Sequence, residues 1–157
     1  MRSRREQPDS SPGTEVQPTG RSERVLLAED DDAMRALLAR ALRRAGFDVI
    51  EASSGYEALD RLARGLMREP SIDLIVSDVR MPGYDGLNIL ASLRQARTPI
   101  PVILITAFGS TATHAAAARL GAFAMVDKPF DVDDLVILVR SALRSAPRPP
   151  VGGQDES

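Results

Sequence analysis

Five residues that could together handle a phosphoryl group each stand at or just after the end of an apolar run. Glu29 and Asp30 follow the first run, Asp78 ends the third, Thr106 ends the fourth and Lys128 follows the fifth. Short apolar runs of this kind are typical of strands buried on both faces of a parallel sheet. Ligands bind at the carboxyl edge of such sheets. The sequence therefore predicts that these five side chains lie together.

These residue types fit one kind of chemistry better than others. Carboxylates crowded into one site repel each other unless a cation joins them. Oxygen ligands without His or Cys favour Mg²⁺, which leaves room for phosphate oxygens. Lys128 offers a fixed positive charge and Thr106 a hydroxyl donor, which suits the oxygens of a phosphoryl group. Because a carboxylate can act as a nucleophile and form an acyl phosphate, Asp78 is the candidate acceptor.

Composition excludes several other classes of protein. The 157 residues carry a net charge of -2, no cysteine and one histidine, so thiol chemistry and multi-histidine metal sites are excluded. Nothing in this charge favours nucleic acid or an anionic membrane as a direct partner. No apolar run reaches membrane-spanning length, and no apolar segment follows the first arginines. We therefore expect a cytoplasmic protein with an apolar core, since 43% of its residues are apolar.

Strands and helices are predicted to alternate along the chain. Strands are expected at Arg24–Ala28, Phe47–Ala52, Leu74–Val76, Val102–Ile105 and Ala122–Val126. Helices are expected from Asp32 to Gly46, Gly55 to Leu66, Gly86 to Leu93, Thr111 to Leu120 and Asp131 to Leu143. Their apolar residues recur at the spacing of one helical face. This alternation predicts an α/β fold, with a parallel sheet that carries helices on both faces.

The two ends of the chain differ in composition from the middle. Residues 1–22 and 146–157 are rich in Pro, Gly, Ser and charged residues and contain few large apolar ones. Such segments cannot bury enough apolar surface to offset the entropy of ordering. We expect two disordered tails around one domain, residues 23–145.

Within that domain, the motifs at the strand ends resemble those of the response-regulator receiver domain, the phosphoacceptor of bacterial two-component signalling. The matching motifs are Glu29-Asp30, Asp78 with Met81-Pro82-Gly83 and Asp85-Gly86, Thr106-Ala107, and Lys128-Pro129-Phe130. The resemblance covers roughly Glu23 to Ser145. It implies a flavodoxin-like, five-stranded parallel sheet in the order 2-1-3-4-5.

The resemblance also implies roles for individual residues. Asp78 would accept the phosphoryl group from a sensor histidine kinase or a phosphotransfer protein. Magnesium would be held by Glu29, Asp30, Asp78 and the backbone carbonyl of Arg80. Thr106, Ala107 and Lys128 would bind or respond to the phosphoryl group, and the Lys128–Pro129 bond would be cis, as X-Pro bonds can be. The protein would be a signalling phosphoacceptor that catalyses only its own phosphorylation and dephosphorylation.

Three features concern how such a domain would signal. Met125 stands where the family usually has Tyr or Phe, so the usual aromatic switch is replaced by an adaptable side chain. The tail is too short for a known output domain, so we expect a free-standing receiver. It would signal through residues 111–143 to a downstream protein, pass the phosphate on, or form a homodimer through that face.

Two sets of residues near this face have open interpretations. Val132, Val136 and Ile137 widen the apolar face of the last helix, which fits either a wide core face or a partner-docking surface. His114 has no acidic neighbour in the sequence and is expected to be a surface residue rather than a phosphodonor.

Two other functions remain alternatives. An Asp-nucleophile, Mg²⁺-dependent phosphatase would use Asp30-Asp31-Asp32, but Asp78 would then have no role. Turnover of a generic phosphate ester would favour it. A flavodoxin-like flavin-binding module lacks a phosphate loop here, because four acids follow the first strand. A yellow purified protein would favour that module.

Overall fold

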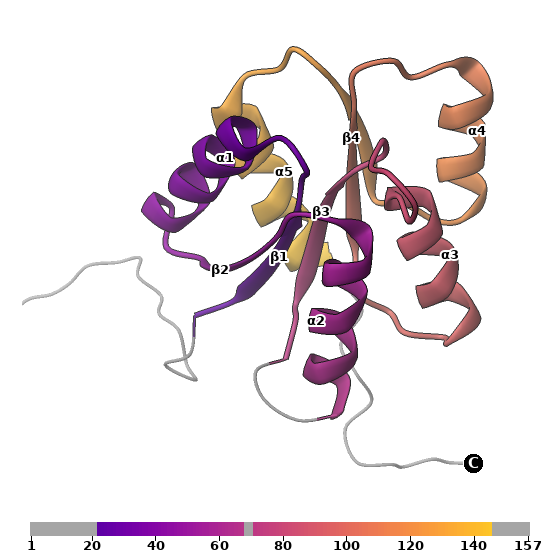
Figure 1. Cartoon of the computed structure of the whole chain (residues 1–157). Helices are drawn as coiled ribbons and strands as arrows, with labels where there is room; N and C mark the ends of the chain where they lie inside the picture. Colours follow the sequence, from indigo (N-terminus) through magenta and orange to yellow (C-terminus); the bar gives the residue numbers. More distant parts are fainter. Residues whose placement is uncertain (1–21, 68–70, 146–157) are drawn as a thin grey trace, which may run out of the picture.

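A parallel sheet forms the middle layer of residues 22–67 and 71–145, the part of the chain that the computed structural model describes. Its five strands run in the order β2-β1-β3-β4-β5 (Figure 1), which confirms the order implied by the resemblance. The strands are β1 (Arg24–Ala28), β2 (Asp48–Ala52), β3 (Leu74–Asp78), β4 (Val102–Thr106) and β5 (Ala124–Asp127). The helices are α1 (Asp32–Arg44), α2 (Gly55–Met67), α3 (Gly86–Gln95), α4 (Thr111–Arg119) and α5 (Val132–Ser145).

Each face of the sheet has its own apolar core. Successive side chains of a strand point to opposite faces, so Ile75 packs on one side and its neighbours Leu74 and Val76 on the other. Buried side chains of α2, α3 and α4 cover the first face, and those of α1 and α5 cover the second. Figure 1 shows the same division, with α1 and α5 together on one side of the sheet. The central strands β3 and β4 are buried along their whole length.

The helices begin where the sequence places capping residues. The Asp31 carboxylate accepts a hydrogen bond from the backbone N–H of Met34 at the start of α1. Asp85 and Asn88 form a reciprocal capping box at the start of α3. Such caps satisfy N–H groups that have no partner within the helix. Because Asp85 caps α3, Asp78 is left free of this role and stands at the end of β3.

Two strand starts were predicted wrongly. β5 starts at Ala124 rather than at Ala122, because the backbone N–H of Ala122 donates to the Ala117 carbonyl and completes the end of α4. β2 starts at Asp48 rather than at Phe47 for the same reason, since the Phe47 N–H donates to the Leu42 carbonyl. In both places the first residue counted as strand closes a helix terminus.

The described part of the chain leaves the two expected disordered tails untested. Apart from Ser22, the predicted disordered tails, residues 1–22 and 146–157, lie outside it. Among the described residues, no helix is both long enough and apolar enough to cross a membrane.

Candidate functional site

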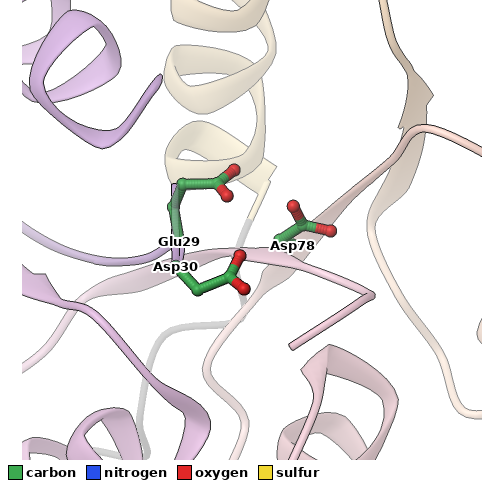
Figure 2. Close-up of side chains that lie close together, drawn as sticks. All are labelled: Glu29, Asp30 and Asp78. Carbon is green, nitrogen blue, oxygen red and sulfur yellow. The ribbon is translucent and has the colours of Figure 1, made fainter. Parts of the chain in front are cut away.

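Three carboxylates from two strands meet at the carboxyl edge of the sheet. Glu29 and Asp30 follow β1, and Asp78 is the last residue of the neighbouring strand β3. One oxygen atom of each carboxylate lies within 4.8 Å of the other two. Figure 2 shows the Asp30 and Asp78 side chains extending into one space, with Glu29 beside them. Glu29 and Asp78 are buried, whereas Asp30 is exposed, so the cluster opens to solvent on the Asp30 side.

Lys128 joins the two buried carboxylates. Its Nζ lies 2.9 Å from Asp78 Oδ2 and 3.3 Å from Glu29 Oε1. Burial by itself would lower the pKa of Lys128, but the hydrogen bond to Asp78 and the charges of Asp78 and Glu29 raise it above its ordinary value. Lys128 is therefore a fixed cation in the pocket.

Glu29 is held in an environment that favours its protonated form. Burial raises the pKa of its carboxyl group from 4.5 to about 7, and the nearby charge of Asp78 adds to the rise. A hydrogen bond from the Asp31 backbone N–H and the charge of Lys128 act in the opposite direction. Asp31 N lies 3.1 Å from Glu29 Oε2. A second cation near Glu29 would favour its ionised form.

The backbone around Asp78 fixes the direction of its side chain. Asp78 Oδ1 accepts a hydrogen bond of 2.8 Å from the backbone N–H of Arg80. Its carbonyl accepts a bond of 3.0 Å from the Ser77 hydroxyl. A Cβ atom added at Gly86 would lie 2.7 Å from that carbonyl oxygen and 2.9 Å from a Leu104 methyl group. Only glycine lets the start of α3 approach the end of β3 this closely.

Thr106 lies at the end of β4, the strand beside β3, and Met125 lies on β5, the next strand along the sheet. Thr106 is fully buried at the end of β4, and its Oγ1 accepts a hydrogen bond of 3.2 Å from the Phe108 N–H. The hydroxyl hydrogen stays available to donate. Ala107 is exposed and begins the loop to α4. Met125 of β5 is half-buried and packs against the core on the α2–α4 face.

The residues expected to form a partner face have separate environments. Val132 and Val136 are partly buried and pack against the core on the α1–α5 face, while Ile137 is 61% exposed. The first two thus widen the core face, and Ile137 alone projects strongly into solvent.

Two contacts near the site join side chains that the sequence did not pair. The guanidinium carbon of Arg80 lies 5.6 Å from the centre of the Phe108 ring, and that ring is 73% exposed. His114 has no acidic neighbour in the sequence, but the fold places its Nε2 3.2 Å from Asp127 Oδ1. Each pair joins residues from different elements, and only the packing of those elements brings them together. The cis Lys128–Pro129 bond, in contrast, confirms an expectation from the resemblance.

The strand order and the acidic pocket at the carboxyl edge define a flavodoxin-like α/β protein of the receiver type. Residues 25–140 match the family model of the response regulator receiver domain, so the chain belongs to this family.

Proteins of known sequence and structure agree with this assignment. The chain is 38% identical over 121 residues to the regulatory protein AtoC of Escherichia coli, covering 77% of this chain and 25% of that protein. It is 37% identical over 122 residues to the transcriptional regulatory protein FixJ of Bradyrhizobium diazoefficiens, covering 78% and 57%. The receiver domain of a Francisella response regulator is 31% identical, with a TM-score of 0.70, covering 78% of this chain and 98% of that one. The chain thus spans about a quarter of the length of AtoC and about half that of FixJ.

Proposed function

We propose that Asp78 accepts a phosphoryl group from a sensor histidine kinase or a phosphotransfer protein. The observation that carries the proposal is the buried Asp78 carboxylate, placed between Lys128 Nζ at 2.9 Å and the acidic pair after β1. Membership of the receiver family supports it. An Asp78 oxygen would attack the phosphorus atom while the bond from phosphorus to the donor nitrogen breaks. The product is an acyl phosphate, and the donor imidazole leaves.

The donor set suits Mg²⁺. Glu29, Asp30, Asp78 and the backbone carbonyl of Arg80 would hold the ion, and these hard oxygen ligands contain no sulfur or nitrogen. Bound there, Mg²⁺ would neutralise the charge of the phosphoryl oxygens. The cluster fits a cation also because Glu29 and Asp78 repel each other within the pocket.

The remaining residues of the pocket would bind the phosphoryl group itself. Lys128 would move part of its hydrogen bonding from the Asp78 carboxylate to a phosphoryl oxygen. Thr106 would donate its hydroxyl hydrogen to another oxygen, beside Ala107. Phosphorylation and its hydrolysis would be the only reactions catalysed, which sets this function apart from that of a phosphatase acting on free esters.

The signal would leave through α4, β5 and α5 toward a downstream protein, a second copy of the domain or a further phosphate acceptor. NtrC of Escherichia coli, which is 38% identical over 119 residues, is named as a DNA-binding transcriptional regulator. The match covers 24% of that protein. For this chain we propose no direct binding of nucleic acid, because its net charge of -2 gives no general attraction to phosphate groups.

Intact-mass spectrometry after incubation with acetyl phosphate and Mg²⁺ tests the proposal. The wild type is expected to gain one phosphoryl group, and Asp78→Asn is expected to gain none. Asp60→Asn, an exposed carboxylate on α2, is the matched control and should label like the wild type. Equal labelling of Asp78→Asn and the wild type would contradict the assignment.

A further inference from the structure

A hydrogen bond outside the acidic pocket connects α4 to the end of β5. His114 Nε2 lies 3.2 Å from Asp127 Oδ1, and the two side chains are 40% and 60% exposed. Asp127 is two residues after Met125, so both side chains project from the same face of β5. Asp127 is also the register partner of Thr106 on β4. The bond therefore lies next to the strand position that would respond to phosphorylation.

The loop from β4 to α4 lies close to both this bond and Thr106. A Cβ atom added at Gly109 would lie 2.6 Å from His114 Nε2, 2.8 Å from Asp127 Oδ1 and 2.9 Å from the Thr106 methyl carbon. All three distances are shorter than Cβ atoms tolerate, so Thr106 and the His114–Asp127 pair meet at the place that a side chain at residue 109 would occupy. Because Gly109 has no side chain, the three groups can enclose it.

This enclosure connects the pair to the Thr106 hydroxyl. Oγ1 and the methyl carbon of Thr106 are both attached to Cβ, so a rotation that turns the hydroxyl toward Asp78 also moves the methyl group. That methyl group lies against Gly109, and Oγ1 accepts a hydrogen bond from the Phe108 N–H. Gly109 and Phe108 must therefore shift when Thr106 turns. The His114–Asp127 pair also lies against Gly109 and would resist the shift.

We propose that His114 and Asp127 form a clamp that positions the loop 107–110 and favours its arrangement in the unphosphorylated protein. Both are positioning residues, because they act on Thr106 through Gly109 and do not enter the acidic pocket. The proposal rests on the proposed function, since it is phosphorylation of Asp78 that would turn Thr106. The clamp would add a modest bias toward the unphosphorylated arrangement in a chain where Met125 replaces an aromatic side chain.

The size of the effect follows from the exposure of the pair. Exposed ion pairs and hydrogen bonds change an equilibrium by at most about fivefold. By linkage, an element that favours the unphosphorylated arrangement lowers the affinity for a phosphoryl group by the same factor. Loss of the clamp should therefore tighten the binding of a phosphoryl analogue by about two- to fivefold.

The first test needs no ligand. Amide hydrogen exchange at Phe108 and Gly109 is measured by NMR in the wild type, His114→Ala, Asp127→Ala and the double variant. The clamp predicts faster exchange of about the same size in all three variants, because each removes the same bond. His114→Gln, whose amide can donate to Asp127, should restore slow exchange. Arg119→Ala, in the last turn of the same helix, is the matched control. Exchange in His114→Ala no faster than in Arg119→Ala would overturn the clamp.

The second test uses beryllofluoride with Mg²⁺ as the phosphoryl analogue, titrated by NMR. His114→Ala should bind it about two- to fivefold more tightly than the wild type, and Arg119→Ala should not. Equal affinity in His114→Ala and the wild type would overturn the clamp alone. No binding by the wild type would overturn the proposed function and the clamp's regulatory role with it.

Discussion

At the residue scale, Glu29 is the group whose protonation depends most on the fold. Its side chain is buried beside Asp78, and the pKa of its carboxyl group is raised from 4.5 to about 7. Between these two pH values the folded protein holds a proton that the unfolded chain releases. The free energy of unfolding therefore falls as the pH rises through this window. In the absence of a metal ion, Glu29 destabilises the fold at neutral and higher pH.

The first prediction is that Glu29→Gln removes this pH dependence. Relative to the variant, the metal-free wild type should lose stability between pH 5 and pH 8, by on the order of 3 kcal/mol at most. Urea unfolding in the presence of a chelator measures the difference. Glu23→Gln, at an exposed position before β1, should follow the wild type at every pH. A constant difference between wild type and Glu29→Gln across the range would refute the prediction.

The second prediction concerns Asp30, the exposed member of the acidic cluster. Asp30→Asn should weaken Mg²⁺ binding and slow phosphorylation, each by roughly tenfold or more. The substitution removes a charged ligand from a site that has few charged ligands. Stability without metal should change by less than about 0.5 kcal/mol, because solvent already screens this carboxylate. Magnesium titration and denaturant unfolding measure the two effects. Asp60→Asn, at an exposed position on α2, is the control. Unchanged Mg²⁺ affinity in Asp30→Asn would refute the ligand role.

At the element scale, the site depends on how α3 begins against the end of β3. Gly86 is the first residue of α3, and its Cα approaches the Asp78 carbonyl so closely that a Cβ would lie 2.7 Å from the oxygen. Asp85 caps the helix at the same point. The position of Asp78 is therefore set by the helix that follows its own strand.

The third prediction is that Gly86→Ala destabilises the fold by about 1–3 kcal/mol through overpacking and also slows phosphorylation of Asp78. The added methyl group must displace the end of β3 or the Leu104 side chain. Denaturant unfolding and the rate of labelling by acetyl phosphate measure the two effects. Ala91→Gly, also in α3, should cost about 1 kcal/mol through helix propensity and leave the rate unchanged. A Gly86→Ala protein that labels at the wild-type rate would contradict the proposed role of this contact.

The positions of the strands and helices were predicted well from the sequence, because each has its own local pattern. The contacts between these elements were not predicted. The apolar runs ending at Glu29, Asp78 and Thr106 carry a local signal, and the parallel sheet makes their ends adjacent. The meeting of His114 with Asp127 has no such signal, because it depends on how α4 packs against β5. The strand starts were misplaced where an apolar residue closes a helix instead, as Ala122 does. Local periodicity thus locates elements and their ends, while long-range geometry needs the fold.

At the scale of the whole molecule, the residues expected to carry the signal are divided between the two apolar cores. The core on the α1–α5 face receives Val132 and Val136 and leaves Ile137 exposed. The core on the α2–α4 face receives Met125, and the His114–Asp127 pair lies on the same side of β5. A change at Thr106 is therefore expected to reach α4 and β5 first. It would reach α5 through the strands whose other face packs against that helix.

The last prediction follows from the side chain that stands on this route. Met125 is half-buried and packs against the core, but it is unbranched and adapts to more than one arrangement. An aromatic ring in its place would choose between two discrete positions. The unphosphorylated protein should therefore sample both arrangements of residues 111–143. Phosphorylation should shift the populations of the two arrangements only modestly. Met125→Tyr should make the two states more distinct.

Amide NMR spectra with and without beryllofluoride and Mg²⁺ test this prediction in the wild type and Met125→Tyr. In the wild type, resonances from residues 111–143 should be averaged between two positions, and the analogue should move them part of the way. In Met125→Tyr the same resonances should move further, because a bulky ring populates fewer intermediate arrangements. One sharp inactive state with full switching in the wild type would refute the prediction. Shifts confined to the surroundings of Asp78 would instead indicate that the domain stores or passes on phosphate, because a switch must change the face that a partner reads.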